Sequence, residues 1–227
     1  MQDFEIESFE EFETSEMFTD DAFETRYIKP LKTKERQKHF LKYANAEKLA
    51  TEIILEKESC FHCIVNGSFI FGDFIEAFIV HNNAHVLKMT ISTLSMDESN
   101  VDSLAELMEG GFVDDLDLIV SGFHYSHKRW TIVDYTYKHL DTDKNNFQLA
   151  VADCHTKICL METDGGKKIV IHGSANLVSS GCLEQFTIEE NEALYDFYFD
   201  YHQKIIELYK TIDKTVRGKK LWGAINN

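Results

Sequence analysis

Apolar residues recur every three to four positions in several segments of the chain, the spacing that places side chains on one face of an α-helix. One such segment begins at Ser99 or Asn100, either of which can cap a helix, and ends at Gly110 and Gly111. Helices are predicted for residues 34–50, 73–82, 100–109, 121–140 and 190–212. The residues expected on the buried face of the last helix are Leu194, Phe197, Tyr201, Ile205, Leu208 and Ile212.

Short apolar runs between these segments predict β-strands. Strands are expected within residues 53–65, 85–92, 116–120, 147–162 and 169–171. The run Thr163-Asp-Gly-Gly-Lys-Lys168 joins the last two of these segments as a hairpin turn. Strands that alternate with helices and then end in a hairpin are typical of a mixed sheet. The predicted fold class is therefore α/β, with a mixed β-sheet flanked by helices on both faces.

Composition limits the classes of protein that the chain can represent. The 227 residues are 44% hydrophobic, which is enough to bury the core of one domain. No run of about 18 apolar residues occurs, so no membrane span is expected, and the acidic N-terminus lacks the apolar region of a secretory signal. The five cysteines are an odd number, which argues against a disulfide framework and favours a cytoplasmic location. Cys60 and Cys63 form a lone CxxC pair within a predicted strand, so they are interpreted as core residues rather than zinc ligands.

The net charge of −16 is concentrated near the N-terminus. Residues 1–25 carry ten acidic side chains and no Lys or Arg, which leaves 29 acidic and 23 basic residues, a net charge of −6, in the rest of the chain. The predicted parts are an acidic, Phe-containing tail at 1–28, one domain at 29–215 and a basic tail at 216–227. Because acids alternate with phenylalanines, the first tail is interpreted either as a disordered solubilising segment or as one that docks on the domain itself or on a protein partner.

Candidate chemistry lies in two short runs, His155-Thr-Lys157 and Gly173-Ser174-Ala-Asn176. If the first run is part of a strand, its histidine and lysine point to the same side because strand side chains alternate. An imidazole can attack phosphorus, a lysine supplies positive charge, and hydroxyl and amide groups supply neutral hydrogen bonds. These side chains therefore suit the binding and attack of a phosphodiester, and the set occurs once in the chain.

The two runs resemble the HKD signature of the phospholipase D superfamily, whose pattern is His-x-Lys, four residues, Asp, a gap, and Gly-Ser-x-Asn. Here Glu162 stands where the family usually has Asp, and the gap before Gly173 is longer than is typical, which an extended hairpin explains. The resemblance covers about residues 50–212, with the motif itself confined to 155–186. It implies the phospholipase D-like form of the predicted α/β fold and cleavage without a metal ion or another cofactor.

The resemblance also implies a mechanism. One histidine attacks phosphorus to form a phosphohistidine, and the histidine of a second motif protonates the leaving group. Because this chain has one motif, it is similar to the small endonucleases of the family that pair as homodimers about a two-fold axis. A carboxylate orients the nucleophilic imidazole, and Glu184 is the candidate here, with Glu189 as the alternative. The expected catalytic residues are His155, Lys157, Ser174, Asn176 and Glu184.

Basic residues elsewhere in the chain are weaker candidates for substrate contact. Residues 123–130 follow a predicted strand end, where α/β folds gather site residues, but they also suit an exposed helix start. The substrate-binding candidates in this run are His124, His127, Lys128 and Arg129. A basic region near the C-terminus is interpreted either as a further nucleic-acid contact or as a solvated tail. It comprises Lys210, Lys214, Arg217, Lys219, Lys220 and Trp222.

Three functions are consistent with these features. The leading hypothesis is a metal-independent endonuclease that acts as a homodimer on nucleic acid, DNA rather than RNA. The first alternative is hydrolysis of a phospholipid or another small diester by the same chemistry, although no Lys- and Arg-rich amphipathic stretch typical of membrane surfaces is evident. The second alternative is a non-catalytic binding or assembly protein that reuses the fold.

Overall fold

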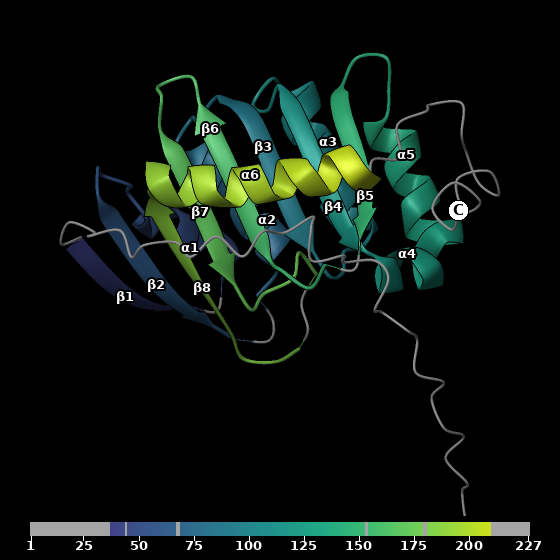
Figure 1. Cartoon of the computed structure of the whole chain (residues 1–227). Helices are drawn as coiled ribbons and strands as arrows, with labels where there is room; N and C mark the ends of the chain where they lie inside the picture. The colour runs from purple at the N-terminus through teal and green to yellow at the C-terminus, as the bar shows by residue number, and fades with distance from the viewer. Residues whose placement is uncertain (1–36, 44, 67–68, 153, 179–180, 210–227) are drawn as a thin grey trace, which may run out of the picture. The chain divides into compact units, whose positions relative to one another are not determined.

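One mixed β-sheet organises the part of the chain that the computed structural model describes (Figure 1). The described residues are 37–43, 45–66, 69–152, 154–178 and 181–209. The strands are β1 (Gln37–Tyr43), β2 (Ser59–Val65), β3 (Val86–Thr93), β4 (Asp115–Ser121), β5 (Asn146–Ala152), β6 (Ile158–Thr163), β7 (Lys168–Gly173) and β8 (Glu184–Glu190). Their order across the sheet is β1-β2-β8-β7-β6-β3-β4-β5. Both predicted tails, Ile212 and the basic residues from Lys210 onward lie outside the described residues.

Strand direction brings distant parts of the sequence to one edge of this sheet. Strands β1, β2, β7, β3, β4 and β5 run in one direction, whereas β6 and β8 are antiparallel to their neighbours. The carboxyl ends of the first group therefore meet the amino ends of β6 and β8 at one edge, which we call the carboxyl edge. Ligand sites in α/β sheets form preferentially at such an edge.

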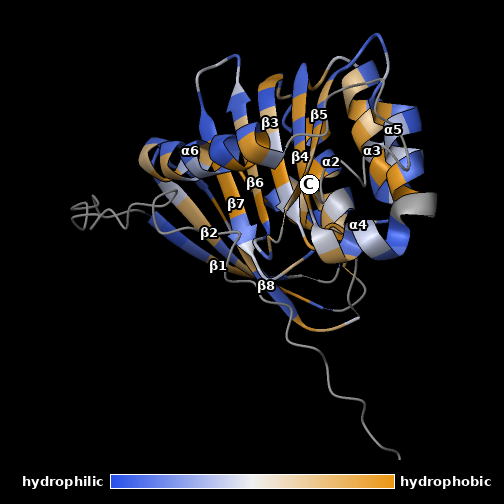
Figure 2. Ribbon diagram, turned by 45° about the vertical axis from the view of Figure 1, so that its right-hand side comes forward, coloured by the Kyte–Doolittle hydropathy of each residue, from blue (hydrophilic) through white to orange (hydrophobic). Residues whose placement is uncertain are grey.

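Helices cover both faces of the sheet (Figures 1 and 2). They are α1 (Ala46–Glu52), α2 (Phe71–His81), α3 (Glu98–Glu109), α4 (Gly122–Lys128), α5 (Asp134–Leu140) and α6 (Glu192–Tyr209), with a π-helical turn, η2 (Arg129–Val133), between α4 and α5. Helix α6 crosses one face over strands β3 to β7, and α1, α2, α3 and α5 pack on the other. The predicted class, an α/β fold with a mixed sheet and helices on both faces, is confirmed.

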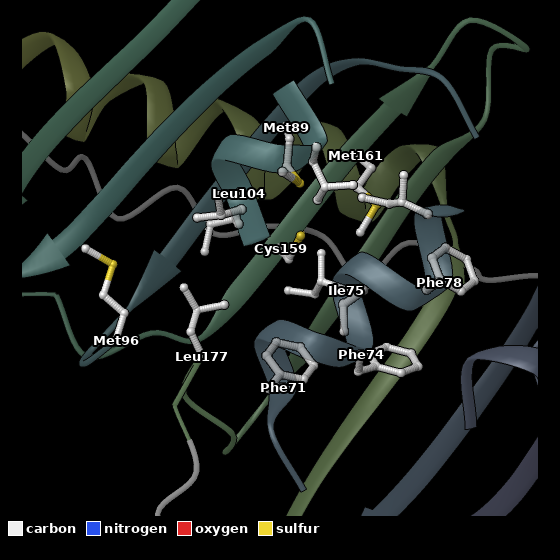
Figure 3. Close-up of a cluster of buried hydrophobic side chains, with 14 of the residues drawn as sticks. Phe71, Phe74, Ile75, Phe78, Met89, Met96, Leu104, Cys159, Met161 and Leu177 are labelled. Carbon is white, nitrogen blue, oxygen red and sulfur yellow. The ribbon is translucent and has the colours of Figure 1, made fainter. Parts of the chain in front are cut away.

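The larger hydrophobic core lies between the sheet and helices α1 to α3 (Figure 3). Phe71, Phe74 and Phe78 of α2 face the sheet, and the ring centroid of Phe74 lies 4.9 Å from that of Phe186 in β8. Two smaller clusters lie beneath α6: one includes Ile119, Ala150, Ile205 and Ile206 at one end of the helix, and the other includes Leu160, Val170 and Tyr195 at the other end. The centre of the sheet is thus buried on both sides, which fixes the positions of the strand ends.

Most predicted elements are present with small shifts of their ends. The helix expected at 73–82 is α2, and the strands expected at 85–92 and 116–120 are β3 and β4. The hairpin is confirmed, because β6 and β7 pair in antiparallel register from Ile158 opposite His172 to Glu162 opposite Lys168.

The helix predicted for 34–50 is wrong in its first half. Gln37–Tyr43 forms β1, which pairs in parallel with β2, and only the following residues form α1. The side chain of Asn45 accepts a hydrogen bond of 2.8 Å from the Lys48 N–H and so marks the start of the helix. The helical spacing of apolar residues in this segment is overridden by pairing with a strand that is distant in sequence.

The buried face predicted for the last helix is also partly wrong. Phe197 and Leu208 are exposed to 49% and 64%, respectively. The buried residues of α6 include Tyr195, His202 and Ile206, so the helix is rotated relative to its most apolar stripe. The rotation places a polar side chain, His202, against β3, where it contacts Ser92.

Candidate active site

The two runs with candidate chemistry meet at the carboxyl edge of the sheet. His155 and Lys157 lie between β5 and β6, and Ser174 and Asn176 lie just after β7. The prediction that His155 and Lys157 share a strand is wrong, because β6 begins only at Ile158. The loop still brings the two side chains together: Lys157 Nζ donates to the His155 carbonyl oxygen at 3.0 Å and lies 3.4 Å from His155 Nδ1.

Gly173 connects the two runs and sets the distance between β7 and β8. Its N–H donates to the Lys157 carbonyl oxygen at 3.2 Å. A Cβ atom at this position would lie 2.2 Å from the Gln185 carbonyl oxygen and 2.6 Å from Phe186 Cα, which only glycine avoids. The close approach of the two backbones places Ser174, the next residue, directly against the start of β8.

Ser174 is held by the first residues of β8. Its N–H donates to the Gln185 carbonyl oxygen at 2.9 Å, and the Gln185 N–H donates to Ser174 Oγ at 3.1 Å. The Ser174 hydroxyl donates in turn to Glu184 Oε2. Glu184 also interacts electrostatically with Lys157, so the carboxylate links the serine to the lysine.

Glu189, the alternative carboxylate, lies toward the other end of β8. It stands opposite Cys60 of β2, and its Oε1 is 3.8 Å from His172 Nε2. The geometry therefore favours Glu184 over Glu189 as the carboxylate of this site. Glu162 similarly lies at the far end of β6. The glutamate that stands in place of the aspartate of the HKD pattern is therefore distant from the carboxyl edge.

The side chain of Asn176 is oriented by the chain that follows β3. Its Oδ1 accepts a hydrogen bond of 3.2 Å from the Leu94 N–H, which leaves Nδ2 as the donor end of the carboxamide. The Leu94 carbonyl oxygen accepts from the Ser121 hydroxyl at 3.0 Å, and Ser121 Oγ accepts from the His124 N–H at 2.9 Å. These bonds tie the ends of β3, β4 and β7 together beside the candidate catalytic groups.

The charge of Lys157 depends on two opposing influences. Partial burial lowers the pKa of its ammonium group, whereas the Glu184 carboxylate and the Cys154 sulfur act to raise it. A bound phosphate would act in the same direction as Glu184, because a nearby anion favours the protonated form. The lysine is therefore suited to bind a phosphate oxygen.

The loop that carries His155 is anchored by polar residues that the sequence does not single out. Thr156 Oγ1 lies 2.9 Å from Ser92 Oγ of β3 and 2.9 Å from Cys154 Sγ. Ser92 Oγ lies 3.0 Å from Nε2 of His202, which is fully buried in α6. A histidine beside the apolar stripe of the last predicted helix is the sequence signal for this contact.

The four predicted substrate-binding residues have different surroundings. His124 is buried, and its Nε2 has no hydrogen-bond partner within the described part of the chain. Burial and, to a smaller extent, the Lys128 charge lower the pKa of His124, which favours a neutral imidazole. His127 and Lys128 are exposed on α4, and the side chain of Arg129 is outside the described structure. His124 is thus linked to the candidate site through Ser121, whereas His127 and Lys128 face solvent.

The cysteines of the CxxC pair are core residues, as predicted. Cys60 and Cys63 are buried thiols of β2, and burial, with a smaller effect of Cys60, raises the pKa of Cys63 to about 12. Among the described residues, no group of three or more His, Cys, Asp or Glu side chains is arranged to hold a metal ion. No helix in this same part of the chain is long and apolar enough to cross a membrane.

Solved structures with a similar arrangement are distant from this chain. NucT from Helicobacter pylori is 13% identical over 66% of this chain and 97% of its own, with a TM-score of 0.46. Nuc from Salmonella typhimurium, a phospholipase D family member, is 12% identical over 57% of this chain and 84% of its own, with a TM-score of 0.43. TrmBL2, an archaeal chromatin protein, is 11% identical over 65% of this chain and 52% of its own, with a TM-score of 0.43. No family model and no curated protein sequence matches the chain.

Proposed function

We propose that the protein is a phospholipase D-like phosphodiesterase, a metal-independent endonuclease that acts on DNA as a homodimer. The main support is the convergence of His155, Lys157, Ser174 and Glu184, from three separate segments, at the carboxyl edge. A nucleophile, a cation and oriented hydrogen-bonding groups are what phosphodiester cleavage requires. The resemblance to the HKD signature includes His155, Lys157 and Ser174 of this set.

In the proposed reaction, an imidazole nitrogen of His155 attacks phosphorus and the bond from phosphorus to the leaving oxygen breaks. Lys157 Nζ and Asn176 Nδ2 donate to the non-bridging oxygens and stabilise the charge that develops there. The protonated His155 of the partner subunit gives its proton to the leaving oxygen. It then takes a proton from the water that attacks the phosphohistidine, so the cycle consumes one water and restores both histidines.

The need for a second subunit follows from the number of motifs. One chain supplies one His155, whereas the reaction uses one histidine as nucleophile and another as acid. An isologous two-fold interface brings identical residues together, so two copies paired at their carboxyl edges would complete the site.

Cleavage of DNA by the full-length protein in excess EDTA tests the proposal. We expect cleavage by the wild type, a phosphohistidine trapped at His155, and a decrease of roughly 10³-fold or more in His155→Ala. His81→Ala is the matched control, because His81 is an exposed histidine at the end of α2. Absence of DNA cleavage by a dimeric wild type, or full activity in His155→Ala, contradicts the proposal. Release of phospholipid head groups without DNA cleavage would indicate that the same chemistry acts on a lipid substrate instead of DNA.

A further inference from the structure

Strand β1 presents an exposed aromatic ring between two lysines. Lys38, Phe40 and Lys42 occupy alternate positions of the strand, so their side chains point to the same face. All three are exposed, and the accessible fraction of Phe40 is 77%. His39 points to the opposite face, where its ring stacks on Phe61 at a centroid distance of 4.4 Å. We call Lys38, Phe40 and Lys42 the β1 platform.

The ring at the centre of the β1 platform is supported from one side. Phe40 stacks on His62 of β2, with ring centroids 5.4 Å apart and ring planes inclined by 20°. His62 Nδ1 lies 3.1 Å from Thr187 Oγ1 of β8, and His62 Nε2 lies 3.6 Å from Cys60 Sγ. The supporting imidazole is therefore held on both of its nitrogens, and Phe40 rests on an ordered ring.

The β1 platform lies on the same face of the sheet as α6. Thr187 stands opposite both His62 of β2 and His172 of β7, and the His172 ring is 6.0 Å from the Tyr198 ring of α6. Helix α6 packs over β3 to β7, so the platform flanks the helix instead of lying beneath it. The side chains of the β1 platform are exposed on this face because α6 does not pack over β1.

A cross-strand row connects the β1 platform to the candidate active site. Lys42 stands opposite Ile64, Ile64 stands opposite Gln185, and Gln185 is hydrogen-bonded to Ser174. Strands are spaced by about 4.8 Å, so three spacings separate Lys42 from Ser174 by about 14 Å. A flexible polymer bound at Ser174 can reach the platform along one face of the sheet.

We propose that the β1 platform binds single-stranded DNA adjacent to the phosphate to be cleaved, with one base stacked on Phe40 and backbone phosphates paired with Lys38 and Lys42. This inference rests on the proposed nuclease function and specifies the form of its substrate. A base must be unpaired before it offers its face to an aromatic side chain, which excludes an intact duplex. Stacking and phosphate contacts require no 2′-hydroxyl. Strand β1 contains no acidic residue, so it supplies local positive charge in a protein of net charge −16.

Fluorescence anisotropy with a labelled single-stranded DNA oligonucleotide tests this site. The full-length protein carries His155→Ala in every sample, so that binding is measured without cleavage. Adding Phe40→Ala is expected to raise Kd by about 5- to 100-fold, because one stacked base is lost. Phe40→Trp retains a ring and is expected to bind as the parent does. The matched control is Phe197→Ala, since Phe197 is an aromatic residue of α6 exposed to 49%.

The lysines are tested by the salt dependence of the same binding. Lys38→Ala with Lys42→Ala is expected to reduce the slope of log Kd against log salt concentration by about 1.4, or about 0.7 for each phosphate contact. Lys204→Ala, which removes an exposed lysine of α6, should leave the slope unchanged.

The outcomes separate this inference from the proposed function. Unchanged Kd in Phe40→Ala, an equal loss for duplex DNA, or binding of single-stranded RNA but not DNA overturns the platform assignment. Weaker single-stranded DNA binding in Phe40→Ala supports the platform even if the wild type cleaves no DNA, a result that would contradict the nuclease function alone. Normal DNA cleavage by the wild type together with unchanged binding in Phe40→Ala would support the nuclease function and contradict the platform assignment.

Discussion

Single residues at the carboxyl edge act through contacts that leave little space for change. Gly173 is the clearest case, because the atoms that a Cβ would meet are the Gln185 carbonyl oxygen and Phe186 Cα. Backbone atoms of a paired strand cannot move aside as the end of a flexible side chain can. Any larger residue would therefore separate β7 from β8 and move Ser174 away from Glu184.

We expect Gly173→Ala to lower the free energy of unfolding by about 1–3 kcal/mol, the usual cost of overpacking a close contact. Urea unfolding followed by circular dichroism measures the change. Gly165→Ala is the matched control, since the nearest atom to its new Cβ is Thr163 Oγ1 at 3.8 Å, and a change within about 0.5 kcal/mol is expected there. Equal stability of Gly173→Ala and Gly165→Ala would show that the approach of β7 and β8 is not as close as described.

At the scale of elements, the sequence predicts the helices and strands whose own residues carry a recognisable apolar or turn pattern. Helix α2 has its own apolar stripe, and the β6–β7 hairpin has a turn marked by two glycines. Strand β8 alternates the buried Phe186 and Ile188 with polar residues and has no continuous apolar run, so it is not among the predicted strands. Strand β1 is misassigned because its conformation depends on pairing with β2.

The same distinction applies to the candidate site. His155, Lys157, Ser174 and Asn176 form a recognisable order in the sequence. The sequence offers Glu184 as the carboxylate with Glu189 as the alternative, and the contacts of Ser174 and His172 separate the two. The anchoring contacts are not recognisable, because they join residues that are 64 and 110 positions apart: Thr156 to Ser92, and His202 to Ser92. The pairing of β3 with β6 brings Thr156 to Ser92, and the packing of α6 on β3 brings His202 there.

Helix α3 shows how a short-range signal can be assigned to the wrong residue. The predicted caps are Ser99 or Asn100, but the N-cap is Asp97, and this prediction is therefore wrong. Asp97 Oδ1 accepts from the Asn100 N–H at 3.1 Å, and Asn100 Oδ1 accepts from the Asp97 N–H at 3.1 Å. The predicted end is confirmed, because Gly110 is the C-cap. A reciprocal pair of bonds thus fixes the start of the helix.

Asp97→Ala is expected to destabilise the protein by about 1 kcal/mol, because the side-chain acceptor of the capping box is lost. Asp97→Ser retains an acceptor and should cost only a few tenths of a kcal/mol. The midpoint of urea denaturation distinguishes the two variants. If both variants lose the same stability, the cap does not contribute through this hydrogen bond.

At the scale of the whole molecule, α6 is the sole helix that covers its face of the sheet in the described part of the chain, and a buried histidine lies in that contact. Burial lowers the pKa of His202 to about 4, although a backbone contact with Tyr198 and the Asp117 charge oppose the shift. The neutral imidazole is therefore the form compatible with the packed helix. Protonation should weaken the attachment of α6 and, through Ser92, the loop that carries His155.

The stability of the protein should consequently fall with pH in a defined range. The folded-state pKa of His202 is below its ordinary value of 6.5, so the unfolded chain binds the proton more readily. The contribution of the neutral histidine is complete above about pH 6.5 and is lost as the pH falls toward 4, with a total on the order of 3 kcal/mol.

Urea unfolding at several pH values, compared between wild type and His202→Gln, isolates this contribution from that of the carboxylates. The difference in free energy of unfolding between the two proteins should change between pH 7 and pH 4, with the wild type losing more. His127→Gln, at an exposed histidine, should follow the wild type throughout. Parallel curves for wild type and His202→Gln would contradict the assigned role, and titration of the His202 ring by NMR provides a direct reading of its pKa.

The β6–β7 hairpin has a consequence for how such proteins diverge. Its two strands begin and end at the carboxyl edge, so its turn, which includes Gly166 at a φ of 75°, lies at the opposite edge of the sheet. Paired residues can be added or removed there without moving either half of the motif. The number of residues between Lys157 and Gly173 is thus free to drift during evolution, and a sequence pattern that fixes this number will overlook chains that retain the same arrangement of residues.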